Sequence, residues 1–188
     1  VVQVFFLKKD YPSVIRYVES VPNAQALLNK KQYDNYYAWT CYRIGESYSQ
    51  LGNPSAAMKW YAQANQLAPL SAEFANKYGN VLASSGNIKE AKRIFLASVN
   101  EHPEYAPAYS NLGYLILSSE GNIPKALELY EKALALDPDY EQGLLNMAGV
   151  MAMQKDFDAA TKYLKRVLKK NPANAQAKAA MIQLSKMK

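Results

Sequence analysis

Apolar residues recur along most of the chain at the three- and four-residue spacing of amphipathic helices. The clearest case lies within residues 106–138, where Leu112, Leu115 and Ile116 share one helical face. A Gly-Asn break follows, and a second apolar stripe then covers residues 126–134. The pattern predicts two short helices joined by a tight turn. Neither helix can bury its apolar stripe alone, so the pair is expected to pack against neighbours of its own kind.

Those neighbours are visible as a repeat of 34 or 35 residues. One slot always holds a small residue: Gly45, Gly79, Gly113 and Ala148. A second small slot holds Ala57, Ala91, Ala126 and Ala160. A bulky slot follows at Tyr61, Phe95, Tyr130 and Leu164, and a proline closes each unit at Pro69, Pro103, Pro138 and Pro172.

Each slot has a physical reason. A glycine or alanine allows two helices to cross closely, and an aromatic ring fills a large space beneath the next unit. Proline lacks the backbone donor that a helix interior needs, so it marks a junction between units. Asparagine, aspartate or serine before an apolar run predicts a helix cap, and such residues stand at Asp34, Asn53, Ser71, Asn87, Asn122 and Asp156.

A repeat of this length and composition resembles the tetratricopeptide repeat, a helix–turn–helix unit, over roughly residues 38–172. The resemblance implies an all-α fold, a right-handed α–α superhelix of stacked helix–turn–helix units. It divides the chain into a partial N-terminal repeat with an irregular helical segment (1–37), four repeats (about 38–71, 72–105, 106–140 and 141–174) and a C-terminal capping helix (173–188).

The N-terminal segment 1–7 is apolar, but lysines follow it instead of preceding it, and no small-residue cleavage site comes next. It therefore does not match a secretion signal. Residues 9–14 resemble residues 155–160, a turn and the start of a second helix. We interpret residues 1–7 as the end of a first helix and predict that the chain is cut from a longer protein. Residues 23–31 depart from the period and predict a short extra helical piece.

Positive charge is concentrated at the C-terminal end. From Lys155 onward the net charge is +7, and the preceding residues carry about −1. Four cations share one predicted helix face: Lys162, Lys165, Arg166 and Lys169. We interpret this face as a solvated outer surface. The alternative is a patch for nucleic acid, an acidic partner or anionic lipid, and nucleic acid is the less favoured because only Tyr163 supplies an aromatic ring there.

No residue pattern predicts catalysis, a cofactor or a metal. The single histidine, His102, precedes a junction proline and has no cysteine or acid cluster at metal-ligand spacing. The single cysteine, Cys41, falls on an inner helix face and is expected in the core. Gly113 and Gly149 lie inside predicted helices and form no phosphate-binding loop. The longest apolar runs are too short to span a bilayer.

The resemblance implies that the first helix of each unit lines a concave groove for an extended peptide or a partner helix. The groove-facing positions so implied are Trp39, Tyr42, Arg43 and Glu46, then Glu73, Asn76, Lys77 and Asn80, then Ser110, Asn111 and Tyr114, and finally Gln142, Leu145 and Asn146. Asn80, Asn111 and Asn146 either grip a peptide backbone or form structural hydrogen bonds between helices. Asn76, Gln142 and Asn146 replace the cations with which some family members bind a C-terminal carboxylate, so that ligand is disfavoured.

An aromatic wall is also predicted from Tyr36, Trp39 and Tyr42, with core packing as the rival interpretation. The resulting prediction is a non-catalytic scaffold or adaptor that binds a protein or peptide in the concave groove. Two alternatives stand beside it. The chain is a regulatory or substrate-recruiting appendage of a larger enzyme or transport system, or its basic C-terminal helices bind an anionic partner or nucleic acid.

Overall fold

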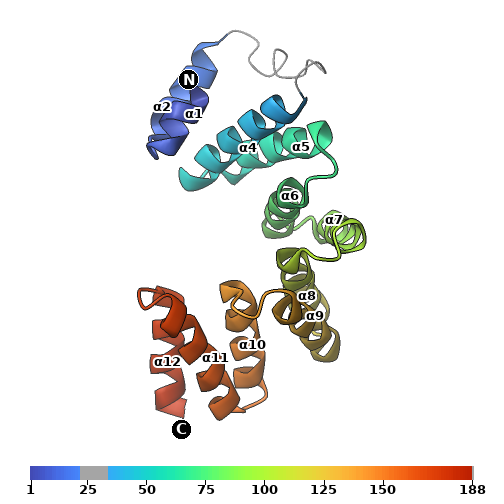
Figure 1. Cartoon of the computed structure of the whole chain (residues 1–188), viewed down its shortest axis with the longest axis vertical. Coiled ribbons are helices and arrows are strands. Elements are labelled where there is room, and N and C mark those ends of the chain that lie inside the picture. Colours follow the sequence, from blue (N-terminus) through green and yellow to red (C-terminus); the bar gives the residue numbers. More distant parts are fainter. Residues whose placement is uncertain (22–33, 188) are drawn as a thin grey trace. The chain divides into compact units, whose positions relative to one another are not determined.

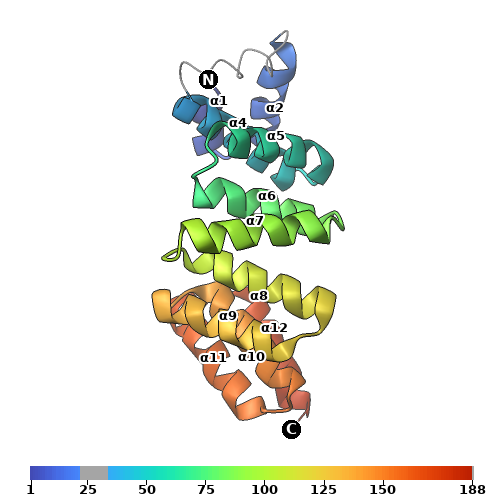
Figure 2. The ribbon, with the colours of Figure 1, turned by 90° about the vertical axis from the view of Figure 1, so that its right-hand side faces the viewer.

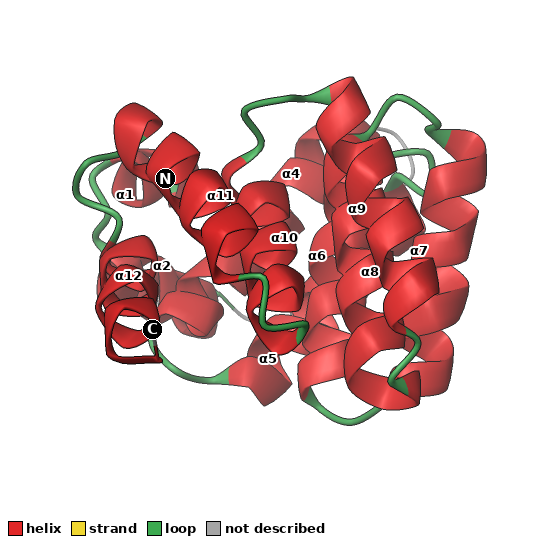
Figure 3. Ribbon diagram, turned by 90° about the horizontal axis from the view of Figure 1, so that it is seen from below, coloured by secondary structure: helices red, strands yellow, loops and turns green. Residues whose placement is uncertain are grey.

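The computed structural model describes residues 1–21 and 34–187, and every regular element in them is a helix (Figures 1 and 3). The helices are α1 (Val2–Leu7), α2 (Tyr11–Ser20), α4 (Asp34–Gln50), α5 (Pro54–Leu67), α6 (Ala72–Ser84), α7 (Ile88–Glu101), α8 (Ala106–Glu120), α9 (Ile123–Leu136), α10 (Glu141–Met153), α11 (Phe157–Lys170) and α12 (Ala175–Met187). The all-α prediction is confirmed. The helical piece predicted at residues 23–31 lies outside the described residues.

The chain forms two compact units, residues 1–94 and 95–188, whose boundary falls within α7. In the first unit, α1 and α2 pack on each other and on α4, α4 pairs with α5, and α5 contacts α6 (Figure 2). Its core joins residues from α2, α4, α5 and α6, including Val14, Ile44, Tyr61 and Phe74. Cys41 is fully buried in this core, as its position on an inner face predicts.

In the second unit, α8 pairs with α9 and α10 pairs with α11. The helix α10 also packs against α8 and α9, and α12 packs against α11. Tyr130 and Ala126 of α9 share a core cluster with Val150 of α10, and Leu144 and Leu164 belong to a second cluster with α12. The pairs α4–α5, α8–α9 and α10–α11 therefore each bury an apolar stripe against a following helix.

Side-chain caps begin the helices where the sequence predicts them. Asn53 accepts a hydrogen bond from the backbone of Ala56 at 3.1 Å, and Asn122 accepts one from Lys125 at 3.1 Å. Two further caps pair Ser71 with the Phe74 nitrogen at 3.4 Å and Asp156 with the Ala159 nitrogen at 2.9 Å. Asn87 directly precedes α7, and the side chain of Asp34, the predicted cap of α4, lies outside the described residues.

The small residue in the first slot lets the two helices of a unit approach closely. A Cβ added at Gly45 would lie 2.9 Å from the ring of Tyr61, and one added at Gly113 would lie 2.7 Å from the ring of Tyr130. Both tyrosines are almost fully buried. The ring in the bulky slot therefore occupies the space that a side chain in the small slot would need.

The turns inside the units share a left-handed residue followed by a capping residue. Glycine takes the left-handed position in three turns, at Gly52, Gly86 and Gly121, with φ of 73°, 84° and 64°. Lysine takes it in two others, at Lys9 and Lys155, with φ of 57° and 62°. Asp10 after Lys9 accepts from the Ser13 nitrogen at 3.2 Å, as Asp156 does from Ala159. The predicted correspondence of residues 9–14 with 155–160 thus extends to the turn conformation.

The turn at Lys155 provides a test of this conformation. A non-glycine residue in the left-handed region costs about 1–2 kcal/mol, and the added flexibility of glycine in the unfolded chain offsets part of that gain. We expect Lys155→Gly to raise the free energy of unfolding by about 0.5–1 kcal/mol, measured by urea denaturation followed by circular dichroism. Gly86→Lys, in a turn with the same backbone hydrogen bonds, should have the opposite sign. A lower stability for Lys155→Gly would contradict the assigned turn.

Candidate partner-binding surfaces on the first helices

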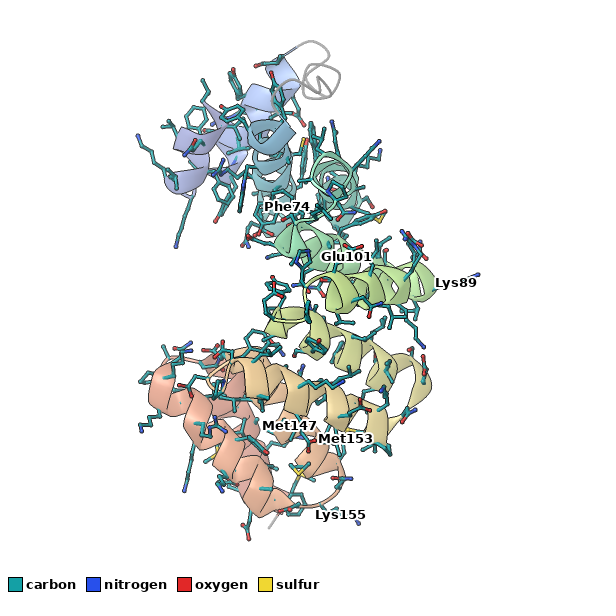
Figure 4. The ribbon with its side chains drawn as sticks, turned by 45° about the vertical axis from the view of Figure 1, so that its right-hand side comes forward. Phe74, Lys89, Glu101, Met147, Met153 and Lys155 are labelled. Atoms are coloured by element: carbon teal, nitrogen blue, oxygen red, sulfur yellow. The ribbon has the colours of Figure 1, made fainter. Side chains whose placement is uncertain are left out.

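The indole of Trp39 on α4 forms part of an exposed aromatic surface of the first unit. The residue is 40% exposed, yet its ring lies edge-on to Phe74 of α6 at 4.9 Å and to Tyr42 at 5.5 Å. Figure 4 shows Phe74 on α6. The guanidinium carbon of Arg43 lies 5.6 Å from the centre of the indole. The ring is therefore held in one orientation while a large part of it stays accessible.

The predicted aromatic wall is divided between surface and core. Tyr42 is only 7% exposed and packs on Phe74 at 5.1 Å and on Tyr61 at 5.8 Å. Burial raises the pKa of the Tyr42 hydroxyl well above its usual range, and the nearby carboxylates of Glu46 and Glu73 raise it further. Tyr36, in contrast, is 60% exposed. Tyr42 therefore packs beneath the surface, and Trp39 and Tyr36 are the exposed aromatic side chains on it.

Glu46 connects three helices of the first unit. Its carboxylate accepts a hydrogen bond from the Tyr61 hydroxyl of α5 and lies 3.0 Å from the Lys77 ammonium of α6. Burial raises the pKa of Tyr61 above its usual range, and the hydrogen bond to Glu46 adds to the shift. Because the Glu46 side chain is 17% exposed and that of Lys77 39% exposed, the ion pair lies at the edge of the surface.

The two asparagines of α6 differ in exposure. Asn76 is 8% exposed and belongs to the packed interior, whereas Asn80 is exposed. Asn80 directly follows the glycine of the small slot in its repeat, and Glu46 and Tyr114 occupy the same position in their repeats. Of the two, only Asn80 presents its amide to an approaching partner.

The second unit contains a chain of polar side chains between α8 and α10. The amide of Gln142 donates to the Asn146 oxygen at 3.0 Å, and the Asn146 amide donates to the Ser110 hydroxyl at 3.0 Å. Ser110 is fully buried and Asn111 is half-buried. Asn146 thus makes the structural hydrogen bond between helices that was one of its two predicted roles. Gln142 and Tyr114, the latter 59% exposed, form the accessible part of this surface.

A hollow between α10 and α12 was not predicted from the sequence. Its volume is about 370 Å³, and its lining includes Leu145, Gly149, Met153, Ala180, Leu184 and Met187. Leu145 was predicted as groove-facing, but the contribution of α12 was not. The available signal was the distribution of methionine, since five of the six methionines lie on α10 and α12.

Some basic side chains of α11 form hydrogen bonds within the second unit. Arg166 donates a hydrogen bond to the carbonyl oxygen of Pro138 and lies 3.8 Å from the Asp139 carboxylate. Lys170 donates to the Asp139 carbonyl oxygen at 2.9 Å. These two cations hold the turn that precedes α10. Arg166 is one of the four cations of the predicted face, and the other three, Lys162, Lys165 and Lys169, are exposed.

The single cysteine and the single histidine have the most reactive side chains, and neither is fully exposed. Burial raises the pKa of the Cys41 thiol to about 12, which disfavours the nucleophilic thiolate. His102 is half-buried, with its Nδ1 atom 3.8 Å from a Glu104 carboxylate oxygen. Across residues 1–21 and 34–187, no three His, Cys, Asp or Glu side chains gather as a metal site. No helix in that same part of the chain has the length and apolar character needed to cross a membrane.

Paired helices with a close crossing, a left-handed turn and a capped second helix define a helical-repeat protein. Three models of the tetratricopeptide repeat match the sequence, over residues 40–69, 76–141 and 117–184. The chain belongs to the tetratricopeptide repeat family. Proteins of this family bind protein partners.

Solved structures with the same fold share about a fifth to a quarter of their residues with this chain. A crystal structure of MamA matches with a TM-score of 0.66 and 24% identity over 94% of this chain and 97% of the other. The tetratricopeptide-repeat protein TTC0263 of Thermus thermophilus matches with a TM-score of 0.73 and 21% identity, covering 80% and 82%. PilF of Pseudomonas aeruginosa matches with a TM-score of 0.72 and 19% identity, covering 99% and 80%. A comparison with curated protein sequences finds no significant match.

Proposed function

We propose that this protein is a non-catalytic scaffold that binds a peptide segment or a helix of a partner protein through the exposed side chains of its first helices. The proposal rests on the exposure of Trp39, which is 40% exposed while Phe74 and Tyr42 fix the orientation of its ring. An aromatic side chain held in place loses little conformational freedom when a partner covers it. Such residues dominate the binding energy of interfaces.

Exposed polar side chains of the same two units offer hydrogen bonds to a partner. Asn80 is exposed on α6, and the Glu46–Lys77 ion pair between α4 and α6 is partly exposed. In the second unit, Tyr114 is the exposed aromatic, and Gln142 is the exposed amide. An amide offers both a donor and an acceptor to a peptide backbone, which supports recognition with limited dependence on sequence.

Affinity capture from a lysate of the source cells, followed by titration of the captured partner, tests the proposal. We expect Trp39→Ala and Tyr114→Ala each to weaken binding by about tenfold or more, because each removes an exposed aromatic anchor. The matched controls remove exposed leucines away from the first helices. Leu70→Ala changes a residue 74% exposed after α5, and Leu136→Ala changes one 44% exposed at the end of α9.

Circular dichroism must show that each variant remains folded. Asn146→Ala is unsuitable here, because it would also leave the buried Ser110 hydroxyl without its bonded amide. If the Trp39 and Tyr114 variants bind the partner as tightly as both leucine controls, the first-helix surfaces are not the binding site.

A further inference from the structure

The outer face of α11 is a row of positive charge. It is formed by three exposed lysines, Lys162, Lys165 and Lys169, which we name the lysine stripe. We propose that the lysine stripe binds an acidic segment of a partner protein, that is, a run of aspartate and glutamate side chains. The inference goes beyond the proposed function, because α11 is the second helix of its repeat and the first-helix surfaces do not include it.

The lysine stripe lies opposite the buried side of its helix. The buried residues of α11 are Ala160, Leu164 and Val167, and they belong to the core that α11 shares with α10 and α12 (Figure 1). The three lysines follow one another at the three- and four-residue spacing of a single helical face, over about 10 Å from first to last. Packing of the apolar side therefore directs this row of ammonium groups into solvent.

The charge of the stripe is not balanced by neighbouring acids. On α9, by comparison, Glu128 pairs with Lys125 at 2.7 Å and with Lys132 at 3.5 Å. The helix α11 carries five basic residues and a single acid, Asp158. The ion pairs among the described residues include Arg166 of this helix but no member of the lysine stripe. The three ammonium groups are therefore available to an external anion.

The stripe also places like charges one helical turn apart. Lys162 and Arg166 are four residues apart, and so are Lys165 and Lys169. Such pairs repel each other and weaken a helix, so a bound anion both attracts the lysines and relieves their repulsion. The net charge of +7 from Lys155 onward adds a longer-range attraction for an acidic partner.

The chemistry of this face favours carboxylates over the phosphates of nucleic acid. Arg166 has the one guanidinium on α11, the group whose planar fork suits a phosphate, and it is already bonded to the Pro138 carbonyl and lies 3.8 Å from the Asp139 carboxylate. The aromatic rings of α11 belong to Phe157 and Tyr163, and both residues are half-buried. Neither offers the open ring on which single-stranded bases stack.

The same face is poorly suited to a lipid surface. Helices that lie on membranes insert large apolar side chains beside their cations. All large apolar residues of α11 are buried or half-buried, so the stripe has charge but no side chain to insert. Proteins of this family bind protein partners, and a protein segment supplies carboxylates without bases or acyl chains.

The dimensions of the stripe suit an extended acidic segment. Side chains on one side of an extended chain recur about every 7 Å, so two carboxylates span most of the 10 Å row. Lysine side chains have flexible four-carbon stems, which adapt to the exact positions of the carboxylates. Recognition therefore depends on the density of negative charge and requires no fixed sequence.

A short peptide that alternates glutamate with glycine tests the inference on the full chain, beside a control peptide with glutamine in place of each glutamate. Because exposed ion pairs are individually weak, binding is followed by NMR of the ¹⁵N-labelled protein at low ionic strength. We expect the backbone amide signals of residues 161–170 to shift with the acidic peptide and to stay in place with the neutral one. The dissociation constant should rise as salt is added.

Two triple variants of equal charge locate the binding. Lys162→Gln/Lys165→Gln/Lys169→Gln removes the stripe, and Lys8→Gln/Lys59→Gln/Lys89→Gln removes three exposed lysines of the first unit. We expect the first to weaken binding of the acidic peptide by about tenfold or more and the second by less than about twofold. Since the stripe variant loses like-charged neighbours, its urea midpoint should be no lower than that of the wild type.

Three outcomes would overturn the inference. The first is unmoved signals in residues 161–170, and the second is equal weakening by the two triple variants, which would show that only net charge matters. The third comes from two further probes, an oligothymidine and vesicles that contain phosphatidylserine. If either binds more tightly than the acidic peptide and is lost in the stripe variant, the stripe is a site for nucleic acid or for lipid instead.

The first-helix variants separate this inference from the proposed function. Trp39→Ala and Tyr114→Ala should bind the acidic peptide as the wild type does. If they lose the cellular partner while the stripe variant binds the acidic peptide fully, the proposed function stands and the stripe inference fails. If they retain the cellular partner while the stripe variant loses the acidic peptide, the first-helix proposal fails and the stripe inference stands.

Discussion

Replacing Gly113 with alanine is expected to lower the free energy of unfolding by about 1–2 kcal/mol, although alanine is the better helix former by about 1 kcal/mol. The reason is the crossing of α8 and α9. The new Cβ would lie 2.7 Å from the Tyr130 ring and 3.2 Å from the backbone oxygen of Ala126. Tyr130 is fully buried, so neither its ring nor the backbone can move away freely. Urea denaturation measures the change.

The fourth repeat supplies a rescue for this variant. There the small slot holds Ala148 and the bulky slot holds Leu164, and both belong to one core cluster. We expect Tyr130→Leu to tolerate Gly113→Ala, so that the double variant loses less stability than the sum of the two single changes. Gly149→Ala is the control, because no atom lies within 4 Å of its added Cβ and it should gain up to about 1 kcal/mol. Strict additivity in the cycle would contradict the proposed contact.

Alkaline pH is expected to lower the free energy of unfolding of this protein by more than the ionisation of its exposed groups alone would. Tyr42, Tyr61 and Tyr130 are buried, and burial raises the pKa of each above the usual range in the folded state. The unfolded chain therefore releases these protons first, at its own pKa of about 10. Stability is fully present below that pH and falls above it. Each tyrosine should cost roughly 1.4 kcal/mol at pH 11, so the three together should cost roughly 4 kcal/mol.

Cys41 should add to the same loss from about pH 9, since its folded pKa of about 12 also exceeds the unfolded value. Urea midpoints at a series of pH values provide the measurement, and tyrosinate absorbance reports ionisation directly. Tyr130→Phe should reduce the loss of stability at high pH by the contribution of one tyrosine. It should leave the fold intact, because no described residue forms a hydrogen bond with the Tyr130 hydroxyl. Unchanged midpoints between pH 9 and pH 11 would show that these hydroxyls ionise freely in the folded protein.

The fold was predictable because its determinants are local and repeated. Gly45 and Gly113 stand opposite aromatic rings, and Asn122 and Asp156 cap the helices that follow the turns, as their sequence positions indicate. Helical periodicity and capping depend on residues only a few positions apart. Even the lysine that replaces glycine in the last turn could be placed, because the capping aspartate after it keeps the register.

The surface chemistry depends on contacts that the period does not specify. Tyr42 and Trp39 are three residues apart on one helix and both contact Phe74, yet Tyr42, which also packs on Tyr61, is buried while Trp39 stays exposed. Asn146 becomes a structural hydrogen-bond donor because Ser110, 36 positions earlier, lies beneath it. The hollow between α10 and α12 requires these two helices to lie side by side, and α12 stands outside the four predicted repeats. The family and the all-α fold follow from the repeat, whereas the binding residues remain a proposal.

The hydrogen bonds from α11 to the preceding turn have a consequence for how this end of the chain opens. Arg166 and Lys170 hold the carbonyl groups of Pro138 and Asp139, which lie between α9 and α10. In a simple repeat array, each helix pair can fray from the end by itself. Here, releasing α11 also frees the turn that orients α10. We therefore expect the last two helix pairs to open as one cooperative unit, with amide protons that exchange together instead of one repeat at a time.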